Sequence, residues 1–435
     1  MKEAVILAAG YGRGLEPITH TRHKVLVPLL GSTLLEHHIS SLAGVGVEKL
    51  VVVVNYLKEQ VAAEALRLAR KYGINVELVD QDEPLGTGHA LLKAADRLTG
   101  DEFLLLYGDV YVGRDDLGRL INESQGGPAI AAYRVNDPER YGVLLTEGGM
   151  LRRIVEKPAN PPSNLINAGV YVLTRDVLRY VERLEPSPRG ELELTDAINE
   201  YARKAGIKVV EASYWVDVGR PWSLLKLSKH LLSHVTKPVI KGVVEEGVRI
   251  KGGVIIEEGA EVRSGTYIVG PAYVGREATI GPNAYLRPYA VVLKGAHIGF
   301  NVEVKESIVM ERTHIAHQAY VGDSIVCEES NLGAGTILAN LRFDDANVRY
   351  VVKGRLEDTG RRKFGAVIGA RVKTGVNVST VPGVKIGACS WINPGLTIYR
   401  DVPPCTHVVR EGVFKQVRCG CVVDLSVWRR GQTLS

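Results

Sequence analysis

The segment from Val248 to Val304 reads VRIKGGVIIEEGAEVRSGTYIVGPAYVGREATIGPNAYLRPYAVVLKGAHIGFNVEV. Every sixth residue counted from Val248 is small or nearly so, and every sixth residue counted from Ile250 is aliphatic. A period of six fits neither a helix stripe nor a two-sided strand. It fits a coil with three short flat faces, each of which points one aliphatic side chain inward. We therefore predict a left-handed parallel β-helix of hexapeptide repeats over residues 246–402.

The repeat has two irregularities. Its phase shifts near Ser307, and it is interrupted from Asn340 to Phe364 before it resumes at Ile386. The interruption is rich in arginine and lysine, which suits either a solvated loop or a loop that meets phosphate groups in a neighbouring subunit. We favour the second interpretation. Its basic residues are Arg342, Arg349, Lys353, Arg355, Arg361, Arg362 and Lys363.

Leucines at helical spacing before the repeat predict a linker helix over residues 223–245. After the repeat, the tail from 403 to 435 contains Trp428 and matches no pattern, so we expect it to cap the end of the β-helix.

The composition is that of a soluble, two-domain protein. A chain of 435 residues is too long for one ordinary core, and its 45% hydrophobic and 24% charged residues are typical of globular domains. The net charge of +5 is small and no block of like charge stands out, so nucleic acid is not an expected partner. The opening sequence MKEAVILAAG has no signal segment and no apolar run could span a bilayer, so we expect no membrane association and a cytoplasmic location.

The five cysteines lack the spacing of a metal site and are expected to be structural. Only three methionines occur in so long a chain, which favours a heat-loving source, where an intracellular disulfide in the tail is possible. The cysteines are Cys327, Cys389, Cys405, Cys419 and Cys421.

The first half of the chain predicts a Rossmann-like α/β domain over residues 1–222. Apolar runs at 4–7, 50–54, 76–79 and 103–107 alternate with helix-like stretches at 34–42 and 59–72. This alternation predicts a mostly parallel sheet with both faces covered. In such sheets, ligands bind at the carboxyl ends of the strands.

Three loops at those predicted ends carry chemistry. The first, LAAGYGRGLEPIT from Leu7, has glycines that let backbone N–H groups approach phosphates closely. Lys24 follows in RHKVLVP, then Gln81 and GTGHA from Gly86, and then YGD ending at Asp109.

These motifs resemble those of the sugar-1-phosphate nucleotidylyltransferases. The chain matches the family's head motif and the lysine and proline that follow it, at Leu7, Ala8, Ala9, Gly10, Gly12, Leu15, Lys24 and Pro28. Further landmarks follow in order: YGV at Tyr141, EKP at Glu156, INAGVY at Ile166, GELELTD at Gly190 and WVDVG at Trp215.

The second half is similar to the acetyltransferase half of the bifunctional N-acetylglucosamine-1-phosphate uridyltransferases, most closely to the archaeal ones. The similarity lies in YLRP at Tyr285, VEVK at Val302, HQAYVGDS at His317 and NLGAGT at Asn331.

The resemblance implies roles for residues in the first half. A sugar 1-phosphate attacks the α-phosphorus of a nucleoside triphosphate, so catalysis consists mainly of positioning and charge neutralisation. Lys24 would contact phosphate, while Asp109 and Asp217 would hold Mg²⁺. The implied nucleotide-binding residues are Leu7, Ala8, Ala9, Gly10, Gly12, Gln81, Gly86 and Thr87, and the implied sugar-binding residues are Gly142, Glu156 and Asn167.

Two positions depart from the family pattern. Gly14 replaces the arginine that faces the leaving pyrophosphate, and His23 replaces the proline before Lys24. Either the loop is rewired, with Arg13 as the substitute cation, or this active site is weakened. We favour rewiring because Lys24 and both aspartates remain.

For acetyl transfer, the resemblance implies that His317 takes the proton from the attacking amine of an amino-sugar 1-phosphate, with acetyl-CoA as the donor. The implied substrate-binding residues are Arg287, Lys305, Tyr320, Asn331 and Asn340. The lysine of the bacterial loop has no clean counterpart, since Ala346 falls near that position.

The leading hypothesis is a bifunctional enzyme that acetylates an amino-sugar 1-phosphate and joins a sugar 1-phosphate to UTP or dTTP. One alternative keeps only nucleotidyl transfer and makes the β-helix a trimerisation scaffold; another makes the head a non-catalytic sugar-nucleotide sensor because of Gly14. A homotrimer is expected, since flat β-helix faces expose aliphatic side chains.

Overall fold

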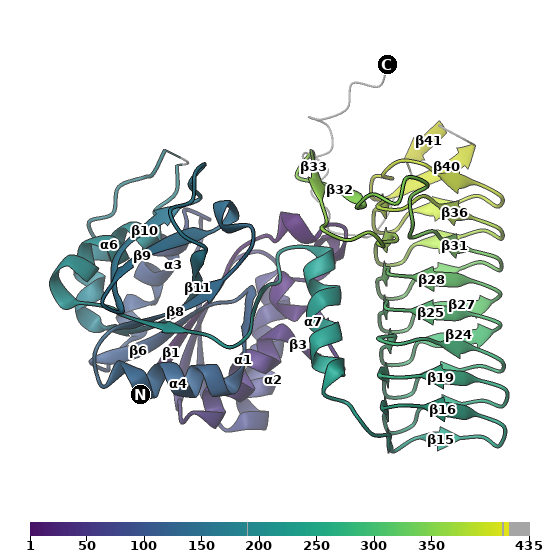
Figure 1. Cartoon of the computed structure of the whole chain (residues 1–435), viewed down its shortest axis with the longest axis horizontal. Coiled ribbons are helices and arrows are strands. Elements are labelled where there is room, and N and C mark those ends of the chain that lie inside the picture. Colours follow the sequence, from purple (N-terminus) through teal and green to yellow (C-terminus); the bar gives the residue numbers. More distant parts are fainter. Residues whose placement is uncertain (189, 411–412, 417–435) are drawn as a thin grey trace. The chain divides into compact units, whose positions relative to one another are not determined.

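The computed structural model describes residues 1–188, 190–410 and 413–416. It divides into two compact units, whose ribbons are drawn in Figure 1. The first unit comprises Met1–Tyr11, His23–Leu26 and Thr33–Val218. The second comprises Gly12–Arg22, Val27–Ser32 and the chain from Gly219 onward. Two short segments near the N-terminus therefore belong, by their contacts, to the unit built from the second half of the sequence.

A nine-stranded sheet forms the centre of the first unit. Its strands, in spatial order, are β5 (Asn75–Asp80), β4 (Lys49–Val54), β1 (Glu3–Ala8), β6 (Glu102–Tyr107), β11 (Leu165–Thr174), β8 (Ala129–Arg134), β12 (Lys208–Glu211), β10 (Met150–Glu156) and β9 (Gly142–Glu147). The first four run parallel, as expected. Beyond them the expectation of a mostly parallel sheet is wrong, since β11 is antiparallel to β6 and β8, and β10 to β12 and β9, although β12 pairs with β8 in parallel.

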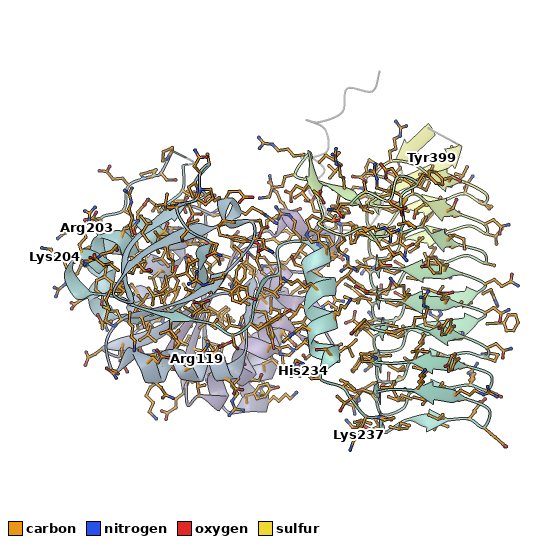
Figure 2. The ribbon with its side chains drawn as sticks, in the orientation of Figure 1. Arg119, Arg203, Lys204, His234, Lys237 and Tyr399 are labelled. Carbon is orange, nitrogen blue, oxygen red and sulfur yellow. The ribbon has the colours of Figure 1, made fainter. Side chains whose placement is uncertain are left out.

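Helices cover both faces of this sheet. One face packs against α1 (Leu34–Gly44), α2 (Lys58–Tyr72) and α4 (Arg114–Ser124), and the other against α3 (Thr87–Ala94), α5 (Leu178–Val181) and α6 (Leu194–Ala205). Arg203 and Lys204 extend from the last turn of α6 (Figure 2), where positive charge complements the helix dipole. From β1 the chain adds β4 and β5 on one side of the sheet and then β6 on the other, so the switch point of the strand order lies between β1 and β6. Open α/β sheets form their ligand-binding crevice at such a switch point.

Three parallel sheets stack into the β-helix of the second unit (Figure 1). The first sheet contains β14 (Val239–Ile240), β17 (Val254–Ile256), β20 (Ala272–Val274), β23 (Val291–Val292), β26 (Ile308–Val309), β29 (Ile325–Val326), β34 (Val367–Ile368) and β37 (Lys385–Ile386). The second contains β15 (Val243–Val244), β18 (Glu261–Val262), β21 (Thr279–Ile280), β24 (His297–Phe300), β27 (His314–His317), β30 (Asn331–Leu332), β35 (Lys373–Thr374), β38 (Trp391–Ile392), β40 (Thr406–Arg410) and β41 (Val413–Gln416). The third contains β16 (Arg249–Lys251), β19 (Tyr267–Val269), β22 (Tyr285–Leu286), β25 (Glu303–Lys305), β28 (Tyr320–Gly322), β31 (Ile337–Leu338), β36 (Ser379–Thr380) and β39 (Thr397–Ile398).

The six-residue period produces this core directly. Val254 pairs with Ala272 and Ile268 with Leu286, so residues three repeats apart stack on successive coils. The aliphatic register from Ile256 to Val304 is fully buried. The predicted fold class is confirmed.

Other elements adjoin the coils. The predicted linker helix is found as α7 (Pro221–Ser233), and the first coil begins at β14, before residue 246. Between β31 and β36 the chain leaves the coil to form the antiparallel hairpin of β32 (Arg349–Val352) and β33 (Arg355–Asp358). Short strands remain in β2 (Pro28–Leu29), β3 (Ser32–Thr33), β7 (Val110–Val112) and β13 (Trp215–Asp217).

In the tail, β40 adds one more parallel strand on β38, and β41 turns back on it. Cys327 is free and buried, while Cys389 and Cys405 are disulfide-bonded. Cys419, Cys421 and Trp428 lie outside the described residues. Among the described residues, no helix is long and apolar enough to cross a membrane.

Candidate active sites

The first candidate site begins where β1 and β6 end. Lys24 Nζ lies 2.6 Å from Asp109 Oδ2, and both side chains are largely buried. A Cβ atom on Gly10 would come within 2.8 Å of Lys24 Nζ, so the glycine leaves the lysine room to cross the loop. Burial alone would raise the pKa of Asp109, but the Lys24 ammonium outweighs it and lowers the pKa below its ordinary value.

The antiparallel pair β7 and β13 brings the second predicted metal ligand to the same place. Asp217 pairs with Val110, next to Asp109, and Val218 N–H donates to Asp109 O at 2.8 Å. Two carboxylates at one strand end suit Mg²⁺, which usually takes one or two carboxylates and completes its shell with water and substrate phosphates. In the described part of the chain, no group of three or more His, Cys, Asp and Glu side chains could hold a metal. Asp109 and Asp217 are the residues here that could hold Mg²⁺.

Two buried histidines lie beside this pair. His23 Nδ1 accepts from Val25 N–H at 3.2 Å, and burial together with the adjacent Lys24 lowers its pKa to about 3. His38, on α1, is buried, which lowers its pKa to about 4. Both imidazoles are neutral near pH 7. The substitution of His23 for the family's proline thus places a neutral, buried side chain in front of Lys24.

The predicted nucleotide-binding turn is held by Gln81. Its Nε2 donates to Gly86 O at 2.9 Å, at the start of α3. Gly86 has φ +108°, and a Cβ atom there would lie 2.7 Å from Leu192 O. Thr87 Oγ1 accepts from Leu194 N–H at 3.1 Å. The turn is therefore fixed against the GELELTD segment.

The three predicted sugar-binding residues are also brought together. Gly142 and Glu156 are paired in register across β9 and β10. A Cβ atom on Gly142 would lie 3.0 Å from Glu156 Oε2 and 3.7 Å from Asn167 Cβ. Asn167 Oδ1 accepts from Gly169 N–H at 2.9 Å, which fixes the orientation of its amide.

A tyrosine pair beside Asn167 is missing from the sequence prediction. Asn167 Nδ2 donates to Tyr171 Oη at 2.6 Å, and the hydroxyls of Tyr107 and Tyr171 are 3.4 Å apart. Burial raises the pKa of Tyr107 to about 12. Both tyrosines belong to motifs that the sequence displays, YGD and INAGVY, but an apolar strand gives no signal that its tyrosines share one hydrogen-bond network.

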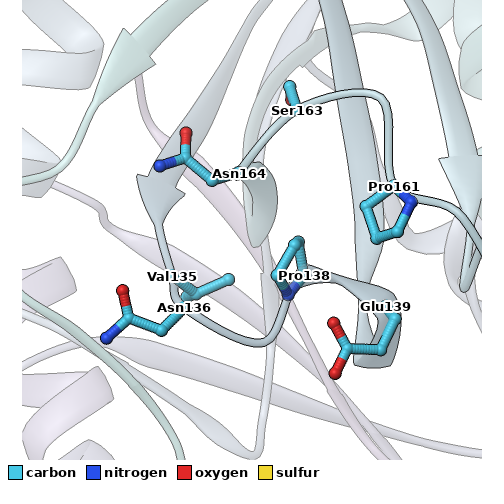
Figure 3. Close-up of a pocket in the computed structure, with 7 residues that line it drawn as sticks. All are labelled: Val135, Asn136, Pro138, Glu139, Pro161, Ser163 and Asn164. Carbon is cyan, nitrogen blue, oxygen red and sulfur yellow. The ribbon is translucent and has the colours of Figure 1, made fainter.

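A surface pocket of about 480 Å³ lies between the end of β8 and the segment that precedes β11 (Figure 3). Its lining includes Asn136, Glu139, Ser163 and Asn164, and none of the predicted sugar-binding residues.

The signature loop around Gly14 belongs to the second unit. Gly12 has φ +75° and precedes a 3₁₀ turn over Arg13–Leu15, in which Arg13 is exposed and Gly14 is buried. A Cβ atom on Gly14 would lie 2.3 Å from Gly219 O and 2.4 Å from a guanidinium nitrogen of Arg220. A side chain at position 14 would collide with the backbone carbonyl of Gly219, so the loop in this conformation has no room for the arginine.

The hairpin β32–β33 contacts the same loop. Tyr350 Oη donates to Glu16 O at 2.7 Å, and Glu357 accepts two hydrogen bonds, at 2.8 and 2.9 Å, from the guanidinium of Arg220. Arg22, in turn, donates to both oxygens of Glu311 on the β-helix at 3.2 and 2.7 Å. The loop is thus held by elements far away in the sequence.

The second candidate site lies on the β-helix. Lys305 donates to both oxygens of Asp323 at 2.9 and 2.7 Å, and Asn340 Nδ2 donates to Asp323 Oδ2 at 2.6 Å and to Tyr320 Oη at 3.1 Å. A Cβ atom on Gly322 would lie 2.4 Å from Tyr320 Oη, so the glycine admits the phenol. Arg287 pairs with Glu303 at 2.9 Å on the same sheet.

His317 and Asn331 lie on the second sheet. His317 ends β27, beside Phe300, and is exposed; Asn331 begins β30 and is also exposed. Among the described residues, the His317 ring has no hydrogen-bond partner. The predicted acetyl-transfer residues therefore occupy two adjoining faces of the β-helix.

Comparison with known proteins finds relatives of both halves of the chain. A family model described as nucleotidyl transferase matches residues 3–234, which places the first half in that class, and one described as the GMPPB C-terminal domain matches residues 268–378. The bifunctional sugar-1-phosphate nucleotidylyltransferase/acetyltransferase of Sulfurisphaera tokodaii is 46% identical over 404 residues, covering 92% of this chain and 98% of the relative.

The bifunctional protein GlmU of Methanocaldococcus jannaschii is 40% identical over 420 residues, covering 96% of this chain and 100% of the relative. The low-salt glycan biosynthesis nucleotidyltransferase Agl11 of Haloferax volcanii is 35% identical over 318 residues, covering 71% and 88%. The chain belongs to the family of bifunctional sugar-1-phosphate nucleotidylyltransferase/acetyltransferases. The resemblance drawn from the motifs is confirmed.

Proposed function

We propose that the protein makes an activated sugar in two steps, acetylating an amino-sugar 1-phosphate on the β-helix and joining a sugar 1-phosphate to UTP or dTTP in the head. The observation that carries the proposal is the convergence of Lys24, Asp109 and Asp217 at the switch point of the sheet, together with an intact acetyl-transfer set in the same chain.

In nucleotidyl transfer, an oxygen of the sugar 1-phosphate attacks the α-phosphorus and pyrophosphate leaves. Lys24 neutralises phosphate charge, and the fixed turn at Gly86 offers backbone N–H groups. Mg²⁺ held by Asp109 and Asp217 would neutralise further negative charge on the phosphates. Glu156 and Asn167 orient the sugar so that its phosphate meets the triphosphate in line. Exposed Arg13 is the residue we assign to the leaving pyrophosphate.

In acetyl transfer, the amine of the sugar attacks the thioester carbon of acetyl-CoA and loses a proton to His317. Its exposed, unengaged imidazole is suited to this role, because a base must have a free nitrogen. Arg287, Lys305, Tyr320, Asn331 and Asn340 hold the amino-sugar phosphate. We further propose a homotrimer and a cytoplasmic location.

The two alternatives have less support. A pure scaffold would not need the Lys305, Tyr320 and Asn340 arrangement, and a sensor head would not need Lys24 and two aspartates together. The test is an assay of the purified protein with a panel of sugar 1-phosphates and nucleoside triphosphates, with and without acetyl-CoA. Pyrophosphate release and acetylation together support the proposal. Absence of pyrophosphate release would favour the sensor, and absence of acetylation the scaffold.

A further inference from the structure

One carboxylate on the β-helix holds two cations. Asp323 is 1% exposed, and its oxygens accept from Lys305 at 2.7 and 2.9 Å and from Arg361 at 3.2 Å. Asn340 donates to the same group at 2.6 Å. A buried carboxylate with three donors is fixed in orientation, so it fixes the positions of the two cations as well.

Arg361 comes from the end of the insertion that interrupts the hexapeptide repeat. Its guanidinium also donates to Glu306 at 2.6 Å and to the Lys363 carbonyl at 3.1 Å. The side chain remains 20% exposed, close to the 16% of Lys305. Both cations are therefore oriented by protein groups and still reachable from solvent.

The charges of this cluster are not balanced. Lys229, Lys305 and Arg361 share the carboxylates of Asp323 and Glu306, so three cations face two anions. Burial raises the pKa of Glu306, but the neighbouring cations, Arg361 first among them, hold it below its ordinary value. The cluster therefore keeps a positive excess at neutral pH, as a binding site for an anion requires.

We infer that Arg361 binds the phosphate group of the amino-sugar 1-phosphate together with Lys305, and that Asp323 is the positioning residue for both. The Nε–H and Nη2–H groups of Arg361 already donate to Lys363 O, Glu306 and Asp323, so the two N–H groups of Nη1 are the donors left for the phosphate. The inference rests on the proposed acetyl transfer and names the group that recognises the phosphate. It also gives a function to the insertion, which lacks a clean counterpart of the bacterial loop lysine.

The test compares a phosphorylated and an unphosphorylated substrate. Acetyl transfer to glucosamine 1-phosphate and to free glucosamine is measured in the wild type, Arg361→Ala and Arg361→Lys, with inhibition by inorganic phosphate measured in parallel. We expect Arg361→Ala to lower kcat/KM for the phosphorylated sugar about 10- to 100-fold, the range for a lost charge-assisted hydrogen bond, and to weaken phosphate inhibition similarly. Activity on the free sugar should change less than about threefold. Arg361→Lys should recover part of the loss.

Arg371→Ala is the matched control. Arg371 lies outside the insertion, is 52% exposed and pairs with Glu329 at 2.9 Å, so its loss should leave both substrates and the phosphate inhibition unchanged. Equal loss of activity on both sugars in Arg361→Ala, with unchanged phosphate inhibition, would overturn the inference and leave Arg361 as a structural tie. Loss of pyrophosphate release in Arg361→Ala would indicate that this variant does not fold. In that case the two sugars and the phosphate inhibition are compared in Arg361→Gln, and that comparison tests the inference. Failure of the proposed function is distinguishable, because the wild type would then acetylate neither sugar.

Discussion

His38 lies buried in α1 as a neutral imidazole next to Asp109. Its pKa is about 4 in the folded protein against an ordinary value near 6.5, so the unfolded chain binds the proton more tightly. Above pH 6.5 His38 is neutral in both states and does not lower the free energy of unfolding. As the pH falls from 6.5 toward 4, the unfolded chain takes up the proton first, and the free energy of unfolding decreases.

We therefore expect His38→Gln to flatten the acid dependence of stability. The free energy of unfolding, measured by urea titration at pH 7 and pH 5, should fall by about 2 kcal/mol less in the variant than in the wild type. His234→Gln, at an exposed position, serves as control and should keep the wild-type dependence. Identical pH dependence in His38→Gln and wild type would show that His38 is not buried neutral.

Gly14 is one of the two positions at which the chain departs from the family pattern, and the structure predicts the effect of restoring the arginine there. Because a side chain there meets Gly219 O and Arg220, Gly14→Arg should lower nucleotidyl transfer by roughly tenfold or more, as overpacking does. Pyrophosphate release measures this. Gly118→Ala, in α4 with no atom within 4 Å of the new Cβ, should be tolerated. A faster Gly14→Arg enzyme would contradict a rewired loop and would mean that the glycine weakens this active site.

At the residue scale, the sequence motifs indicated the candidate site residues but not the side chains that position them. Lys24, Asp109 and Asp217 were predicted because each stands in a motif that resembles the family's, and the structure brings Lys24 to Asp109 and Asp217 next to Asp109. The role of Asp323 could not be predicted, because an aspartate inside a motif looks the same whether it is exposed or buried. Arg361 was expected only as one of several basic residues in a loop that meets phosphate in a neighbouring subunit, and nothing in the sequence indicated its pairing with Asp323.

At the scale of elements, the hairpin β32–β33 is the least expected feature. The sequence suggested that residues 340–364 reach toward a neighbouring subunit, which stays untested. The structure instead shows Tyr350 and Glu357 of this hairpin in contact with Glu16 and Arg220. The insertion therefore supports the signature loop.

We expect the double variant Tyr350→Phe, Glu357→Gln to lower the kcat/KM of nucleotidyl transfer about fivefold or more, because the loop loses hydrogen bonds worth about 1–3 kcal/mol each. Acetyl transfer should stay within about twofold. Leu356→Ser, at an exposed hairpin position, is the control. A variant that loses only acetyl transfer would contradict this account of the hairpin.

The sheet of the first unit shows where periodicity stops being informative. Alternating strands and helices predicted β1, β4, β5 and β6 correctly. The antiparallel strands β9 and β10 are joined at Gly148 and Gly149, both with positive φ, and such a tight turn reverses the chain without a helix. A prediction based on alternating strands and helices therefore does not find the β9–β10 hairpin.

At the scale of the whole molecule, exposed aromatic side chains line the β-helix. Tyr267 and Tyr285 stack at 5.6 Å on the third sheet, and Tyr399 is 64% exposed and labelled near the last coils in Figure 2. A monomer would leave this apolar surface wet. We expect light scattering at micromolar concentration to give a mass near three times 47.4 kDa, and a chain ending near Leu227 to be monomeric. A full-length mass near 47.4 kDa would rule out the trimer.

The central claim is that one chain carries two separate active sites, and the most direct measurement assays both reactions in two variants. Asp109→Ala removes a proposed metal ligand and should abolish pyrophosphate release while acetylation continues. His317→Ala removes the base and should lower acetylation about a hundredfold or more, while pyrophosphate release continues at the wild-type rate. Loss of both reactions in either folded variant, or full acetylation by His317→Ala, would contradict the account.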